Sequence, residues 1–214
     1  MGQHHITVTK TARYFTLGNA ENPTQVWFVC HGYTQLADQF VRLFAPVNDG
    51  TRLIVAPEGL SRFYTDHAAR TVGAGWMTSE DRLAEIDDYV RYLNALYTHI
   101  FAEIDRAAVG CVVLGFSQGV ATVCRWAVAG GVAVDRLVMW GGLLPPDLDL
   151  ARHRQKLAES NLTIVLGSDD ELVSSAARVR QEEELRNHTI PFSTILFEGG
   201  HRLDRNVLSQ LVEV

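Results

Sequence analysis

The segment Val-Leu-Gly-Phe-Ser-Gln-Gly-Val at residues 113–120 places a serine between two glycines, after an apolar run and before a helix-like one. Serine is a weak nucleophile at neutral pH and needs a neighbouring base that a third group orients. A strand–turn–helix junction of the form Gly-x-Ser-x-Gly projects the hydroxyl above a sheet, with Gly115 and Gly119 as the small flanking residues. The pattern favours Ser117 as a nucleophile, although a serine that caps the following helix would give the same local sequence.

A histidine suited to the role of base follows a late apolar run. In Phe-Glu-Gly-Gly-His at residues 197–201, two glycines turn the chain directly after an expected strand, so His201 would lie at the carboxyl edge of a sheet. A histidine in an ordinary surface loop is the alternative. The other histidines considered are weaker candidates because they lie on expected helices or in a long loop: His67, His99, His153 and His188.

An acid for this histidine should leave another strand end. Gly-Ser-Asp-Asp at residues 167–170 offers Asp169 and Asp170, and the residues alone leave the choice between them open. Aspartate after glycine is also common in turns between strands and helices. The order serine, aspartate, histidine is that of α/β hydrolases, whereas unrelated serine proteases use other orders.

Backbone N–H groups would have to stabilise the oxyanion of an attacked carbonyl. The N–H of Gln118 lies at the start of the helix after Ser117, where the helix dipole assists it. A second donor should come from the loop after an early strand, and the N–H of Tyr33 in His31-Gly32-Tyr33 is in that place. We interpret His31 as a structural residue that forms hydrogen bonds within the loop.

The elements that must position these residues alternate along the chain. Apolar runs that are almost continuous are typical of strands covered on both faces of a parallel sheet. They occur at 25–30, 52–57, 108–116, 135–142, 161–168 and 192–200. Helical periodicity fills the gaps at 36–45, 79–104, 118–130, 151–159, 173–188 and 203–213. Residues 4–10 and 12–18 resemble a hairpin. The alternation of expected strands and helices predicts one α/β domain over 1–214, with a mostly parallel central sheet and helices on both faces.

Five short motifs together resemble the phospholipase/carboxylesterase family of α/β hydrolases, which includes bacterial carboxylesterases and acyl-protein thioesterases. They are HGY (31–33), APEG (56–59), GFSQG (115–119), GSDDELV (167–173) and GGH (199–201). The resemblance implies an α/β-hydrolase fold without a cap domain, and oxyanion roles for the N–H groups of Tyr33 and Gln118. Its Gly-x-x-Asp-x-x-Val pattern selects Asp170 as the acid. The chain departs from the family at Tyr33-Thr34, where Leu-Gly is usual.

The stretch 58–78 is expected to be a long loop that is unusually apolar. The resemblance places a tryptophan near the site, so Trp76 is expected to form a wall of the substrate pocket, together with Tyr33, Phe63 and Met77. Aromatic side chains that only anchor the loop are the alternative. Arg62 and Arg70 are interpreted as solvated charges rather than as a site for an anionic substrate.

These observations predict a serine hydrolase that cleaves carboxylic esters of small soluble substrates through an acyl-enzyme. Residues 143–160 leave room for one loop and one helix, and none for a cap domain. The alternatives are an acyl-protein thioesterase or lysophospholipase that acts on long acyl chains, and a non-catalytic binding module on a hydrolase fold. The sequence leaves the physiological ester, the choice between ester and thioester, and a homodimeric state open.

The bulk composition argues against several other classes. A formal charge of −6 disfavours nucleic acid as a partner. No apolar stretch approaches the length of a membrane span, and the beginning lacks the apolar core of a signal peptide, which favours a cytoplasmic protein. Three cysteines in apolar runs are expected to be buried and reduced. No ligand spacing for a metal is evident, and neither a metal nor an organic cofactor is expected.

Overall fold

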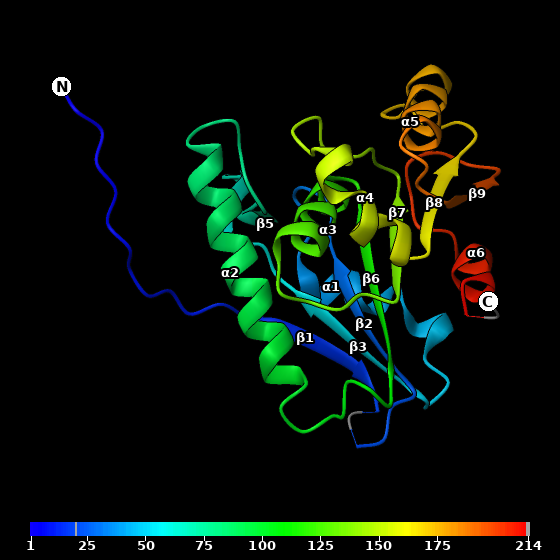
Figure 1. The fold of residues 1–214 in the computed structure, drawn as a ribbon. Coiled ribbons are helices and arrows are strands. Elements are labelled where there is room, and N and C mark those ends of the chain that lie inside the picture. Colours follow the sequence, from blue (N-terminus) through cyan, green and yellow to red (C-terminus); the bar gives the residue numbers. More distant parts are fainter. Residues whose placement is uncertain (20, 213–214) are drawn as a thin grey trace.

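The computed structural model describes residues 1–19 and 21–212, which fold around a seven-stranded sheet (Figure 1). The strand order is β1-β3-β2-β6-β7-β8-β9, and every neighbouring pair is parallel except β1 and β3. The strands of this sheet are β1 (Tyr14–Gly18), β2 (Gln25–Cys30), β3 (Arg52–Pro57), β6 (Gly110–Phe116), β7 (Arg136–Trp140), β8 (Leu162–Gly167) and β9 (Phe192–Phe197). The prediction of a mostly parallel central sheet is confirmed.

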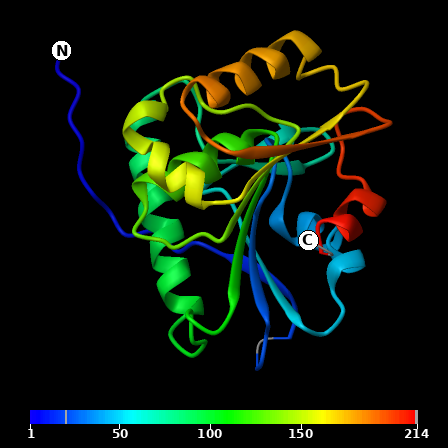
Figure 2. The ribbon, with the colours of Figure 1, turned by 45° about the vertical axis from the view of Figure 1, so that its right-hand side comes forward.

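Helices cover both faces of the sheet (Figures 1 and 2). One face packs against α2 (Arg82–Ile100), α3 (Gln118–Ala129), α4 (Leu150–Glu159) and α5 (Ser175–Asn187). The other packs against α1 (Ala37–Arg42), the short 3-10 helix η1 (Ala45–Val47) and α6 (Arg205–Gln210). Because both faces are covered, the residues of β3 and β8 are buried throughout, which is why these strands are apolar without alternation.

The expected N-terminal hairpin is wrong. Residues 1–13 form no strand, and β1 instead pairs antiparallel with β3, with Phe15 opposite Ala56. The segment before β1 runs away from the body of the molecule in Figures 1 and 2, where it is blue. The alternation of Ile6 and Val8 with threonines resembles a strand, but both side chains are exposed because no neighbouring strand takes them up.

The expectation that 58–78 is a loop is also wrong. This stretch forms a second, two-stranded antiparallel sheet from β4 (Ser61–Asp66) and β5 (Thr71–Gly75). The hairpin lies against the loop after β2: the N–H of Thr34 donates to the carbonyl of Ala74 at 2.9 Å. Gly73 is required at this contact, since a Cβ there would lie 2.6 Å from the carbonyl oxygen of Thr34.

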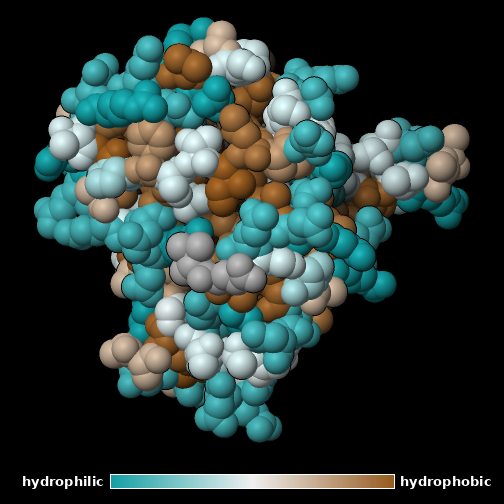
Figure 3. Space-filling view, turned by 90° about the vertical axis from the view of Figure 1, so that its right-hand side faces the viewer, coloured by the Kyte–Doolittle hydropathy of each residue, from teal (hydrophilic) through white to brown (hydrophobic). Residues whose placement is uncertain are grey.

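The segment between β7 and β8 contains one helix, α4, and no cap domain. Figure 3 views the side of the molecule that bears α5, β9 and α6, where hydrophobic side chains show between hydrophilic ones. β9 is an edge strand there, and Leu196 on it is exposed. All three cysteines are buried and free. Among the described helices, none combines the length and the apolar character needed to cross a membrane.

A close crossing of α3 over β2 and β6 fixes the centre of the fold. A Cβ on Gly119 would lie 2.2 Å from the carbonyl oxygen of Cys30, and one on Gly115 would lie 2.3 Å from the carbonyl oxygen of Gly119. Only glycine permits backbones to approach this closely. The two glycines that flank Ser117 therefore bring the beginning of α3 against the carboxyl ends of both strands.

The substitution Gly119→Ala is expected to lower the free energy of unfolding by about 1–3 kcal/mol, because overpacking must push α3 away from β2. Gly131→Ala is the matched control, since a Cβ at that position would meet no atom within 4 Å. Urea unfolding monitored by circular dichroism measures both variants. Equal stability of Gly119→Ala and the parent protein would contradict the close crossing.

Candidate active site

Ser117 lies in the turn between β6 and α3 with φ 54° and ψ −118°. A non-glycine residue in such a conformation stores roughly 1–3 kcal/mol of strain and persists only where its surroundings hold it. Here the Ser117 N–H donates to the carbonyl of Trp140 at 2.9 Å, and the Ser117 carbonyl accepts from Val120 at 2.9 Å. The turn thus has the sharp, strained form in which a nucleophilic serine is presented.

The alternative that Ser117 is a helix cap is not supported by the geometry. Its side chain makes no capping hydrogen bond to α3, whereas Asp149, Ser174 and Asp204 each cap their helices through side-chain oxygens. Ser117 is partly exposed at the carboxyl edge of the sheet. The hydroxyl group is therefore not committed to a local structural hydrogen bond.

His201 and Asp170 come together although 31 residues separate them. His201 Nδ1 lies 2.9 Å from Asp170 Oδ2, and the carboxylate is 1% exposed. The other carboxylate oxygen accepts from the N–H groups of Leu172 and Val173 at 2.9 and 3.0 Å. With both oxygens bonded, the carboxylate has a fixed orientation toward the imidazole. Asp169, the other candidate, forms no hydrogen bond with His201 among the described contacts, and its carboxylate accepts from the Ser168 hydroxyl at 3.2 Å.

The imidazole of His201 packs beside the serine turn. The centroid of its ring lies 4.9 Å from that of Phe116, the residue before Ser117. The ring also lies next to Gly141, which follows Trp140, and the Trp140 carbonyl accepts the hydrogen bond from the Ser117 N–H. Among the described contacts, no hydrogen bond joins Ser117 Oγ to His201. Such bonds are often long in a free enzyme and tighten when substrate binds.

Two backbone donors flank the serine. Gly32 lies directly beside it, since a Cβ on Gly32 would be 3.2 Å from Ser117 Cβ. Within the described residues, the N–H groups of Tyr33 and Gln118 donate to no backbone carbonyl and to no side chain. The neighbouring N–H groups are occupied: Gly32 donates to Gln35 Oε1 at 2.8 Å, and Thr34 to Ala74. The two N–H groups expected to form an oxyanion hole are thus available.

His31 holds the loop that carries one of these donors. Its buried ring donates from Nδ1 to the Gly32 carbonyl at 2.8 Å and accepts at Nε2 from the Gly59 N–H at 3.0 Å. Because the Gly59 N–H can only donate, Nε2 must be unprotonated, and the ring is the neutral tautomer with the proton on Nδ1. Burial lowers the pKa of His31. This agrees with its interpretation as a structural residue.

The Gln118 side chain connects the beginning of α3 to the backbone of residues 76–77, a role that the sequence pattern did not indicate. Its Oε1 accepts from the Trp76 N–H at 3.0 Å, and its Nε2 donates to the Met77 carbonyl at 2.8 Å. The Trp76 indole is 1% exposed and donates to the His31 carbonyl at 2.8 Å. The residue expected as a pocket wall therefore lies beneath the loop 31–33, as a support.

A hollow of about 480 Å³ lies next to the two backbone donors. Of the four residues expected to form the pocket, Tyr33 and Met77 line it directly, and Phe63 stacks on Tyr33 with ring centroids 5.2 Å apart. Trp76 is not among its lining residues. The complete lining is Tyr33, Met77, Thr78, Ser79, Arg82 and Gln118.

The carboxylate of Glu58 links the end of the loop 31–36 to more distant segments. No pattern in the sequence indicated this role. Arg13 donates to the carboxylate at 2.6 and 3.0 Å, Arg62 at 3.1 Å, and the N–H of Ala37 at 3.3 Å. Burial would raise the pKa of Glu58, but these hydrogen bonds outweigh it and hold the pKa below its ordinary value. Arg62, interpreted as a solvated charge, is an ion-pair partner of a buried acid.

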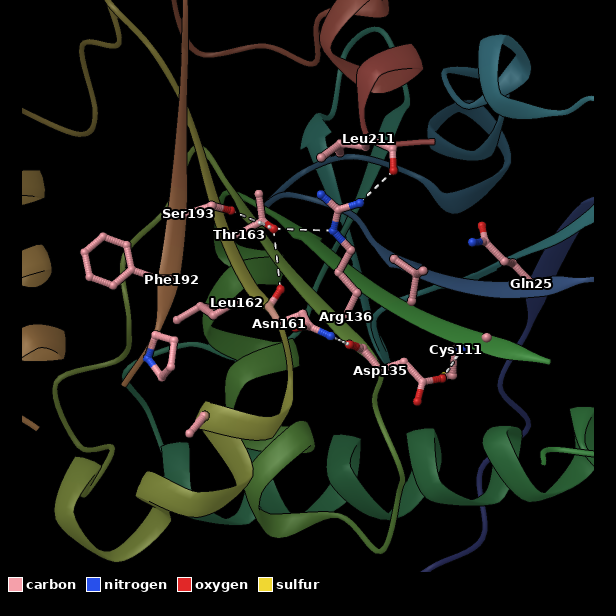
Figure 4. Close-up of a pocket in the computed structure, with 14 residues that line it drawn as sticks. Gln25, Cys111, Asp135, Arg136, Asn161, Leu162, Thr163, Phe192, Ser193 and Leu211 are labelled. Carbon is pink, nitrogen blue, oxygen red and sulfur yellow. Dashed lines mark hydrogen bonds between the residues drawn. The ribbon is translucent and has the colours of Figure 1, made fainter. Parts of the chain in front are cut away.

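A second cavity of about 540 Å³ lies at the amino ends of β6, β7, β8 and β9 (Figure 4). Arg136 in it donates to the Leu211 carbonyl at 2.7 Å, and Asp135 accepts from the Cys111 N–H at 2.7 Å. Because Ser117, Asp170 and His201 follow the carboxyl ends of strands, this cavity is at the opposite edge of the sheet. No group of three histidine, cysteine or acidic side chains suited to a metal ion occurs in the described part of the chain.

No protein-family model matches the chain, and no curated protein matches it in sequence. Several solved structures, however, are similar to it in fold. Acyl-protein thioesterase 2 from Zea mays is 17% identical over 95% of this chain and 97% of its own, with a TM-score of 0.73. A carboxylesterase from Mesorhizobium loti is 18% identical over 94% of each chain, with a TM-score of 0.72. The Bacillus cereus carboxylesterase is 16% identical over 94% of this chain and 92% of its own, with a TM-score of 0.69.

At these identities the likeness establishes the fold. The chain has the α/β-hydrolase fold, without a cap domain, over nearly its whole length. The names of the similar structures agree with the resemblance seen in the five motifs.

The pH dependence of folding tests the neutral state of His31. Its pKa is lowered in the folded protein, so below about pH 6.5 the unfolded chain binds a proton that the folded chain does not. The free energy of unfolding therefore decreases as the pH is lowered. His31→Gln keeps one donor and one acceptor but removes the titrating group. Between about pH 7.5 and pH 5 it should lose less stability than the parent, by on the order of 1 kcal/mol.

Urea unfolding at both pH values measures this difference. His188→Gln is the control, because His188 is only partly buried and lies at the end of α5. The same loss of stability in His31→Gln and in the parent protein would rule out a buried neutral His31.

Proposed function

We propose that the chain is a serine hydrolase that cleaves carboxylic esters of small soluble substrates through an acyl-enzyme. The observation that carries this proposal is the fixed Asp170–His201 pair at 2.9 Å, beside a strained serine whose hydroxyl caps no helix. The α/β-hydrolase fold supports it, since the similar structures include carboxylesterases and a thioesterase.

In the proposed reaction, Ser117 Oγ attacks the acyl carbonyl while His201 Nε2 takes its proton. Asp170 accepts from the Nδ1–H of His201, which keeps Nε2 free to act as the base and stabilises the imidazolium that forms. The negative charge that develops on the carbonyl oxygen is stabilised by the N–H groups of Tyr33 and Gln118. His201 then protonates the leaving alcohol, and water, activated by the same imidazole, releases the acid.

A long-chain acyl-protein thioesterase or lysophospholipase is the second candidate. The similarity in fold to the acyl-protein thioesterase of Zea mays favours it. The mostly apolar, open hollow beside Gln118 is compatible with both candidates. Rates for p-nitrophenyl esters of increasing acyl length separate them: a maximum at short chains supports the small-ester hydrolase, and a rise toward long chains supports the alternative.

Ser117→Ala is expected to lower the turnover of p-nitrophenyl butyrate by at least about 10⁴-fold, because it removes the nucleophile. It should also abolish labelling by a fluorophosphonate probe. Ser168→Ala is the matched control, an exposed serine near Asp170 that leaves the proposed nucleophile intact. Unchanged turnover in a folded Ser117→Ala protein would refute the proposal.

Asp170→Asn tests the role of the acid. The amide oxygen can still accept from Leu172 and Val173, but the amide NH₂ then faces His201 Nδ1 and selects the wrong tautomer. We expect kcat to fall by about 10³–10⁴-fold with little change in thermal stability. Asp169→Asn, one position earlier and exposed, should retain nearly full activity. Similar losses in both variants would argue against the selective role of Asp170.

A further inference from the structure

The hollow beside the proposed oxyanion donors contains one charged side chain, Arg82. The other lining residues are aromatic, thioether, hydroxyl and amide side chains. His201, which must protonate the leaving alcohol, does not line the hollow. Since the alcohol must depart on the side of His201, a substrate with its carbonyl oxygen at the donors of Tyr33 and Gln118 extends its acyl group into the hollow, toward Arg82.

Arg82 shares its only carboxylate partner among the described residues with a second arginine. Arg125 binds Asp147 through two hydrogen bonds, at 2.6 and 3.1 Å, and Arg82 reaches the same carboxylate at 3.0 Å. Arg125 is buried and also contacts Met77 in the wall of the hollow at 3.5 Å. Two guanidinium groups on one carboxylate leave one positive charge uncompensated in this cluster.

Two acidic side chains that lie near Arg82 in the sequence are committed elsewhere. Glu85 accepts from the N–H of Thr78 at 2.6 Å and from its hydroxyl at 3.3 Å, and so fixes the rim of the hollow. Asp81, which precedes Arg82, pairs with His5 at 2.8 Å. Neither contacts the Arg82 guanidinium.

The position of Arg82 in its own helix is electrostatically unfavourable. It is the first residue of α2, where the positive end of the helix dipole disfavours a cation and acidic residues are preferred. Its side chain is 36% exposed, at the edge of the hollow. A residue that opposes a local preference is expected mainly where a function requires it.

We propose that Arg82 binds a carboxylate at the far end of the acyl group, and that the preferred substrates are monoesters of dicarboxylic acids. This inference rests on the proposed function, because it specifies which acyl group the same site accepts. The guanidinium offers paired N–H donors that suit a carboxylate, and the apolar walls of Tyr33 and Met77 suit the intervening methylene groups.

The test compares p-nitrophenyl hydrogen succinate, glutarate and adipate with the corresponding ω-methyl esters, which have the same chain but no charge. In the parent protein the ratio of kcat/KM for acid over methyl ester should reach about 10–100 for the best chain length. Arg82→Gln should bring this ratio close to 1, and Arg82→Lys should restore part of it. Arg91→Gln, an exposed arginine on the same helix that pairs with Asp88, should leave the ratio unchanged.

A ratio near 1 in the parent protein, or an unchanged ratio in Arg82→Gln, would overturn the inference while leaving the proposed function intact. Hydrolysis of neither ester would contradict the proposed function. Calorimetric binding of glutarate monomethyl ester to Ser117→Ala then decides the inference separately: binding that weakens at least about tenfold with Arg82→Gln supports it, and binding that is absent or insensitive overturns it.

Discussion

The close contact between α3 and the ends of β2 and β6 is the constraint on which the site depends. Gly119 packs against the carbonyl of Cys30, so the beginning of α3 lies beside the loop that follows β2. The same contact brings Gln118 and Tyr33 to one hollow, one from each element, and their N–H groups have no hydrogen-bond acceptor within the part of the chain that the structure describes. It also forces the turn between β6 and α3 to be so sharp that Ser117 takes a positive φ. A strained serine and two unpaired donors thus have one common cause in packing.

Buried polar groups hold this arrangement against the strain. His31, Trp76 and the Gln118 side chain form a connected set of hydrogen bonds in which the backbone of one segment is bound by the side chain of another. The set ties the loop after β2 to the end of the β4–β5 hairpin and to α3. Within a buried region such bonds are strong, and each partner left alone would be costly. The hairpin is therefore part of the support of the candidate site.

The sequence predicted the sheet and the approximate helices because strands buried on both faces must be apolar throughout. It also placed Ser117, Asp170 and His201 at strand ends, where a parallel sheet brings them to one edge. It missed the β4–β5 hairpin because β4 is largely exposed and β5 (Thr-Val-Gly-Ala-Gly) is rich in glycine, so neither strand is a continuous run of large aliphatic residues. The cluster of Arg82, Arg125 and Asp147 was also missed, since its members are far apart in the chain and meet only through packing. Charged side chains have no periodicity that reveals such a meeting.

Three carboxylates on the elements around the site differ in the cations that face them. Glu58 is bound by Arg13 and Arg62, and Asp147 by Arg82 and Arg125, and arginine stays protonated at any physiological pH. Asp170 alone faces a histidine, with its other oxygen bound by two backbone N–H groups. In the proposed reaction the proton moves between Ser117 and the imidazole that Asp170 orients, and neither arginine ion pair takes part. Acid–base chemistry at Ser117 would thus be kept separate from the ion pairs that hold the surrounding segments together.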